Sequence, residues 1–243
     1  ALPIFETFAE IATETLPKLA IDKAELKEKG FSPANHARQF SAIIEVMICE
    51  LYSILDGIKL TTFEIYGGSV RGIQQKSTSK LFSKAAESSY GSGLPKEIEE
   101  TLAKAYVEWF PELRRLRTAF THGGLGSCWL DDDTQKISYM NSSLGNDKSA
   151  HIINDIVEHI NKLATSVFDL SGSYFHTLYA QLNQVESDQF CGIYKARMYM
   201  RKVKPEPNLH WTSGRCISKD WFATEPEFTC PLVEKCSAYG RVA

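Results

Sequence analysis

The stretch FSAIIEVMICELYSIL at residues 40–55 decides the fold class, because its apolar residues recur every three or four positions. That period matches one face of an α-helix, which turns once every ~3.6 residues. Ser32 and Pro33 lie just upstream and offer an N-cap and a first-turn proline, a common start of a helix. The sequence therefore predicts a long, amphipathic helix that begins near these two residues.

Helical period also appears on both sides of this stretch. The further helices that it predicts cover residues 4–19, 96–122 and about 150–182. Pro111 is expected to kink the second of these, and Gly123-Gly124 to end it with a left-handed glycine cap. The stretches 61–75 and 88–95 have no period and many glycines or serines, and they are predicted to be loops around a short helix.

The remaining parts of the chain lack the helical pattern. Two short strand-like runs at residues 128–140 predict a β-hairpin whose turn carries three aspartates. After Gln184 aromatics, prolines and cysteines replace the helical pattern, so we expect a helical bundle over 1–185 and a separate region over 186–243. The predicted fold is thus mainly α, a bundle of four to five helices with a small β-hairpin, followed by an irregular α/β or β-rich extension.

Composition excludes some classes of protein and leaves others open. The 243 residues are 43% hydrophobic and 23% charged, which suits a globular chain with a real core. Apolar runs are interrupted by charges well before the ~18 residues of a membrane span, so we predict no transmembrane helix and, by default, a cytoplasmic protein. The net charge of −3 argues against binding nucleic acid through the overall field, and phosphate contacts would need a local basic patch.

One basic segment stands at the end of the predicted helix 96–122. Arg114, Arg115, Arg117 and His122 precede Gly123 there. Basic side chains near a helix C-terminus commonly complement its dipole, each contributing about 0.3–1 kcal/mol, and need no ligand. The types of these residues alone therefore leave two interpretations open: charges that stabilise the helix end, or a site that binds a ligand.

Arg117, four intervening residues and His122 at a helix end resemble the R-x4–6-H motif of the HEPN superfamily, and the resemblance covers about residues 1–185. It implies a helical bundle that acts as a homodimer and cleaves RNA without a metal ion. Arg117 would then hold the scissile phosphate and His122 would move the proton. Arg114, Arg115 and Thr118 would extend the substrate-binding surface, although many active members have Asn or Asp where Thr118 stands.

The spacing of the motif adds a geometric expectation. Five residues along a helix turn the two side chains about 140° apart, so Arg117 and His122 do not share one face. A composite site between two protomers would bring them together. Members of the superfamily include toxins and defence components, so an antitoxin or another protein partner is a further expectation. The alternative is a non-catalytic HEPN-like module for dimerisation or protein interaction.

The C-terminal region holds four of the six cysteines, Cys191, Cys216, Cys230 and Cys236. They leave three interpretations open: packed free thiols without any cofactor, a zinc site with His210 as a spare ligand, or two disulfides. The spacing lacks the tight C-x2–4-C pairs that zinc sites usually show. The basic run 194–204 is predicted to be a strand, either one that contacts nucleic acid or an edge strand protected by lysines.

Overall fold

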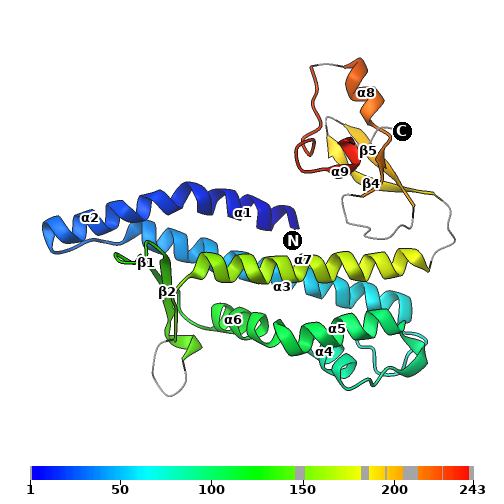
Figure 1. Cartoon of the computed structure of the whole chain (residues 1–243), viewed down its shortest axis with the longest axis horizontal. Coiled ribbons are helices and arrows are strands. Elements are labelled where there is room, and N and C mark those ends of the chain that lie inside the picture. The colour runs from blue at the N-terminus through cyan, green and yellow to red at the C-terminus, as the bar shows by residue number, and fades with distance from the viewer. Residues whose placement is uncertain are drawn as a thin grey trace. The chain divides into compact units, whose positions relative to one another are not determined.

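A computed structural model describes residues 2–145, 151–181, 186–194, 196–204, 213–225 and 227–240. The chain forms two compact units, residues 1–170 and 171–243, and each is considered by itself (Figure 1). His210 and the expected boundary near residue 185 fall outside the described residues.

Helix α3 (Asn35–Tyr66) is the centre of the first unit. Its apolar stripe is buried as predicted, and Ile48, Leu51 and Leu55 have no exposed surface. Burial of each such side chain stabilises the fold by about 1.5–3 kcal/mol. The helix is longer than expected, because residues 61–66, predicted to be part of a loop, form its last turns.

The start of α3 is capped from another helix. Ser32 was expected to be the N-cap, but the helix begins after Ala34, whose side chain has no cap oxygen. The carboxylate of Asp22 accepts a hydrogen bond of 2.8 Å from the backbone N–H of Ala37 instead. A carboxylate suits this position because it satisfies a free N–H group and complements the helix dipole.

Two layers of helices cover α3 (Figure 1). On one side lie α1 (Leu2–Thr15), a short 3-10 turn at Leu16–Lys18 and α2 (Leu19–Lys29). On the other lie α4 (Thr78–Ala86), α5 (Lys96–Glu108) and α6 (Phe110–His122). Helix α7 (Ile156–Ala180) completes the first unit with its residues up to Leu170, and Phe168 contacts Phe5 of α1 edge-to-face.

The predicted kinked helix 96–122 is two helices. Trp109, with φ −148° and ψ −23°, leaves the helical conformation and ends α5, and Pro111 stands in the first turn of α6. A proline in the first turn loses no hydrogen bond, because the first N–H groups of a helix have no partner within it. The break therefore starts a new helix where the sequence suggested a bend.

A three-stranded antiparallel sheet follows α6. Strands β1 (Ser127–Leu130) and β2 (Ile137–Asn141) form the predicted hairpin, and the carboxylate of Asp131 accepts hydrogen bonds from the backbone N–H groups within its turn. Strand β3 (His151–Ile153) pairs with β2. The sequence predicted that residues 151–153 begin the last helix, but that helix starts only at Ile156. A 3-10 turn, Ser142–Leu144, lies between β2 and β3.

The second unit is built on another three-stranded antiparallel sheet, of order β4-β5-β6. Its elements are β4 (Ser187–Tyr194), β5 (Arg197–Val203), β6 (Arg215–Cys216), α8 (Lys219–Thr224) and α9 (Ser237–Gly240). The basic run 194–204 was predicted to be one strand, but Tyr194 ends β4 and only Arg197–Val203 form β5. Strand β5 is the middle strand and not the predicted edge. One face of β5 packs Tyr199 and Val203 into a small core with Phe222.

The architecture agrees with the predicted class, mainly α with smaller β regions. Within the described ranges, none of the helices is long and apolar enough to cross a membrane.

Candidate functional site

The exposed face of α6 carries most of the predicted site residues. Arg114, Thr118 and His122 follow one another at intervals of four, so they stand above one another on the helix, and all three are exposed. Ser143, in the 3-10 turn after β2, faces the same end of the helix. Together they line an open groove of about 480 Å³ whose walls are Pro111, Arg114, Arg115, Thr118, Ala119, His122, Gly123 and Ser143.

Arg115 also borders this groove, but its guanidinium is committed to the fold. It donates two hydrogen bonds to the carboxylate of Glu112, at 2.8 and 2.9 Å, and a third to the backbone oxygen of Leu144, at 3.0 Å. His159 of α7 lies 3.4 Å from the same carboxylate. The neighbouring His159 and Arg115 lower the pKa of Glu112 to about 2, against the opposing effect of burial. Arg115 therefore anchors the 3-10 turn to α6 and does not stand free for a ligand.

Arg117 lies on a different face of α6, as the spacing predicted. Its guanidinium sits 5.3 Å from the ring centre of Tyr52 on α3, a cation–π contact. Arg117 is half-buried and is not one of the residues that line the groove of His122. Burial and the nearby Asp56 raise the pKa of Tyr52, whereas Arg114 and Arg117 lower it. Arg114 thus lies between the two faces, near Tyr52 on one side and in the groove on the other.

The end of α6 differs from the prediction. Gly123 was expected to adopt a left-handed cap, but its φ of −100° and ψ of −175° are extended. A glycine is required for another reason: a Cβ atom here would overlap Ser143 Oγ and come within 2.6 Å of the backbone oxygen of Ala119. The close approach of the 3-10 turn to the helix end, and not a positive φ, explains this glycine.

A polar network supports the chain just after His122. The Tyr139 hydroxyl donates a hydrogen bond of 2.6 Å to Glu45 on α3, and Glu45 also accepts one of 2.7 Å from the backbone N–H of Gly126. The amide of Asn141 donates to the Tyr139 oxygen and to the backbone oxygen of Gly124, both at 3.0 Å. Burial, followed by the hydrogen bond with Glu45, raises the pKa of Tyr139 strongly. The residues that follow His122 are therefore fixed to Glu45 of α3 and to Asn141 of β2.

Sequence reasoning did not identify Ser143, Glu112, Glu45 or Tyr139. The i,i+3 spacing of Glu112 and Arg115 is a local signal of their ion pair. Ser143, Glu45 and Tyr139 reach the site through contacts distant in sequence, for which the chain shows no local pattern.

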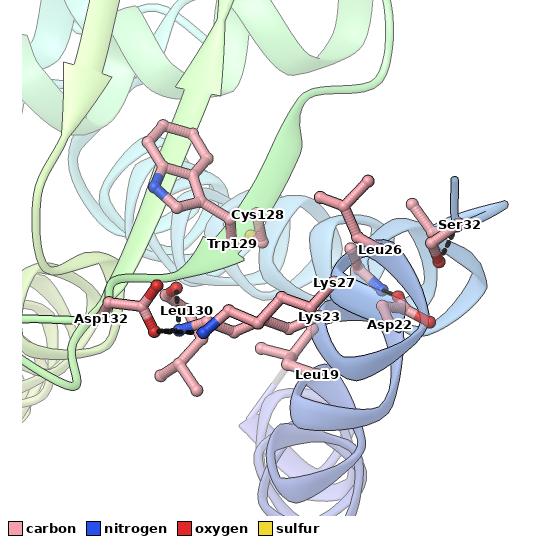
Figure 2. A pocket seen from close by; sticks show the side chains of 12 residues that line it. Leu19, Asp22, Lys23, Leu26, Lys27, Ser32, Cys128, Trp129, Leu130 and Asp132 are labelled. Atoms are coloured by element: carbon pink, nitrogen blue, oxygen red, sulfur yellow. Dashed lines mark hydrogen bonds and ion pairs between the residues drawn. The ribbon is translucent and has the colours of Figure 1, made fainter. Parts of the chain in front are cut away.

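A second hollow lies between α2, the start of α3 and β1 (Figure 2). It measures about 410 Å³ and is largely apolar, with Leu19, Leu26 and Trp129 in its walls. Lys23 and Lys27 both pair with Asp132 across it. The Cys128 thiol borders the hollow, and burial raises its pKa to about 12, so it stays protonated and unreactive at neutral pH.

All six cysteines of the chain are free. Over the described ranges, no group of three or more His, Cys, Asp or Glu side chains is arranged to hold a metal ion. His210, the spare ligand that the sequence suggested, lies outside those ranges.

No protein-family model, curated protein or solved structure matches this chain. An arginine, an imidazole and two hydroxyl groups on one open surface can bind a phosphate group and exchange a proton with a bound hydroxyl.

Proposed function

We propose that the protein is a HEPN-type endoribonuclease that binds RNA in the α6 groove. The observation that carries this proposal is the alignment of Arg114, Thr118 and His122 on one exposed face of α6, opposite Ser143. The position of Arg117 and His122 at the end of a helix in a helical unit supports the same family.

The groove supplies the groups that RNA cleavage needs. Arg114 binds a phosphate through its planar guanidinium, and the hydroxyls of Thr118 and Ser143 offer further hydrogen bonds to phosphate oxygens. His122 takes the proton of an RNA 2′-hydroxyl as its oxygen attacks the adjacent phosphorus. The bond to the 5′-oxygen breaks, and that oxygen takes a proton from water. The products are a 2′,3′-cyclic phosphate and a 5′-hydroxyl end.

A homodimer would bring Arg117 and His122 together at one site. Arg117 and His122 of one chain occupy different faces of α6, so one chain alone does not place both on a substrate. In the proposed dimer the α6 faces of two protomers lie opposite each other, and Arg117 of one protomer acts beside His122 of the other. The charge that develops on the phosphate is then stabilised by arginines from both chains.

The first experiment measures cleavage of end-labelled single-stranded and stem-loop RNA in EDTA. Replacing His122→Ala is expected to lower the rate by about 10²–10⁴-fold, the usual contribution of a general acid or base. His151→Ala is the matched control, because His151 is an exposed histidine of the same unit that lies on β3. Equal cleavage by His122→Ala and the unchanged protein, or none by either, would reject the proposed reaction.

The second experiment tests the composite site by mixing two inactive variants, Arg117→Ala and His122→Ala. If each site joins Arg117 of one chain to His122 of the other, half of the randomly mixed dimers hold one intact site, and about a quarter of the original activity returns. A site within one chain would return none. Sedimentation of the unmixed protein gives the state of association independently.

The third experiment concerns RNA binding without cleavage, measured by fluorescence anisotropy at several salt concentrations. Removing one phosphate contact with Arg114→Ala is expected to weaken binding and to reduce the slope of log K against log salt by about 0.7 for a single strand. Arg38→Ala, an exposed arginine on α3, is the control and should leave the slope unchanged. Binding that is insensitive to Arg114 would place RNA elsewhere on the protein.

A further inference from the structure

The hollow of about 410 Å³ between α2, the start of α3 and β1, here called the α2–β1 hollow, has mainly apolar walls (Figure 2). Leu19 and Leu26 line it from α2, and Trp129 and Leu130 line it from β1. Its volume lies within the range of about 300–1,000 Å³ that small-molecule sites in proteins occupy. The hollow is therefore large enough for a small ligand with an apolar body.

The start of α3 forms another wall of this hollow. Ala34 and Ala37 line it and contribute only a methyl group each, which leaves the space beside them open. The carboxylate of Asp22 also borders the hollow, but it is buried and accepts the hydrogen bond from the backbone N–H of Ala37. Its negative charge is offset by the N-terminal end of the α3 dipole. Asp22 therefore supports the wall and is not free to pair with a ligand.

Two residues of the walls expose apolar surface to water. Leu26 is 55% exposed and Trp129 is 37% exposed, although both line the hollow. The removal of apolar surface from water is favourable in proportion to the area removed. Because Leu26 and Trp129 come from α2 and β1, on different sides of the space, an apolar ligand between them covers both side chains at once. This burial supplies the driving force for binding.

The rim of the hollow carries two ammonium groups and one exposed carboxylate. Lys23 and Lys27 extend from α2 to the same carboxylate oxygen of Asp132, in the hairpin turn (Figure 2). Lys23 also donates to the backbone oxygen of Leu130 at 3.2 Å. The Lys27 ammonium lies 3.5 Å from Asp132 and its side chain is 68% exposed, so water weakens this pair. Two positive charges thus share one carboxylate, and Lys27 can pair with a further anion.

We propose that the α2–β1 hollow binds a small amphipathic acid, a free molecule with an apolar chain and one carboxylate, such as a medium-chain fatty acid. The chain lies between Leu26 and Trp129, and the carboxylate binds the ammonium group of Lys27 at the rim, beside Asp132. The aliphatic stems of Lys23 and Lys27 add to the apolar contact. A cationic headgroup on the same chain lacks this pairing and is repelled by both lysines, so the site selects an acid.

The test is the binding of sodium decanoate to the full-length chain, measured by calorimetry below the concentration at which decanoate forms micelles. Saturable binding of one molecule per chain is expected. Octanoate should bind about tenfold more weakly, because it buries two fewer methylene groups. Decylammonium has the same chain length with the opposite charge and should bind about fivefold more weakly than decanoate. No saturable binding of decanoate, or equal affinities for decanoate and decylammonium, would overturn the proposal.

Variants locate the acid on the protein. Leu26→Glu removes an apolar wall and adds a negative charge, so it should weaken decanoate binding about tenfold or more. Ile21→Glu is the matched control, because Ile21 is 50% exposed on the same helix and does not line the hollow. Lys27→Ala should weaken decanoate about 2–5-fold without weakening decylammonium. Equal losses of decanoate binding in Leu26→Glu and Ile21→Glu would contradict the assigned place.

Tryptophan fluorescence identifies the wall directly, and it decides the question even if Leu26→Glu fails to fold. Decanoate that carries bromine on its chain quenches the tryptophans that it contacts, and Trp129 lines the hollow. Quenching should be lost in Trp129→Phe and kept in Trp109→Phe, a change at the end of α5. Unchanged quenching in Trp129→Phe would place the chain elsewhere and overturn the proposal. None of these measurements uses RNA, so the acid site and the proposed nuclease are tested separately.

Discussion

Replacing Tyr139 with phenylalanine removes a single oxygen atom from the network that supports the end of α6 and leaves the ring in place. Tyr139 is fully buried, and its hydroxyl donates to Glu45 at 2.6 Å and accepts from Asn141 at 3.0 Å. The variant creates almost no cavity, so the cost comes from the lost hydrogen bonds. A bond to a charged group contributes about 1.5–3 kcal/mol, and the carboxylate of Glu45 keeps its bond from Gly126.

This cost is large enough to measure. For a protein of this size 1 kcal/mol corresponds to about 2–4 °C in the melting temperature, so Tyr139→Phe should lower it by about 3–12 °C. Tyr106→Phe is the matched control, since Tyr106 is half-buried, stacks on Phe110 and has no hydroxyl hydrogen bond recorded among the described residues. That change should cost less than about 0.5 kcal/mol.

The assay is urea unfolding followed by circular dichroism, with calorimetry for the melting temperature. Glu45→Gln combined with Tyr139→Phe completes a double-mutant cycle, and a coupling energy above about 0.5 kcal/mol is expected for residues in contact. If Tyr139→Phe unfolds at the same urea concentration as Tyr106→Phe, or if the cycle shows no coupling, the network does not stabilise this end of α6.

Two further changes test the surroundings of the groove. The pKa of Glu112 in the folded protein is lowered to about 2, so its stabilising contribution is present above the ordinary carboxyl pKa and is lost as the pH falls from about 5 toward 2. The Glu112→Gln variant should therefore unfold more easily than the unchanged protein at neutral pH and should lose this pH dependence. Urea titrations at several pH values would show both effects. Gly123→Ala should destabilise the fold by about 1–3 kcal/mol through overlap with Ser143. Gly124→Ala is its control, because a Cβ there meets no atom within 4 Å, and equal melting temperatures for the two variants would contradict this argument.

Much of the helical framework could be predicted from local pattern. The stripe at residues 40–55 and the hairpin at 128–140 appear where the sequence places them. Errors occurred at the ends of elements, as at residues 61–66 and at Trp109, where neighbouring helices and a first-turn proline decide where a helix stops. The candidate site was predicted in part: the motif residues follow from spacing, but their partners on other elements do not.

The sequence by itself determined that the chain is mainly helical and that Arg117 and His122 face different ways on one helix, because both follow from the period of an α-helix. Only the tertiary structure decided that Ser143 faces the side of α6 that carries Arg114 and His122, and that Arg115 also binds the backbone oxygen of Leu144. It alone revealed why Gly123 is needed. Such contacts join residues far apart in the chain, so they depend on packing and register, which local periodicity does not encode.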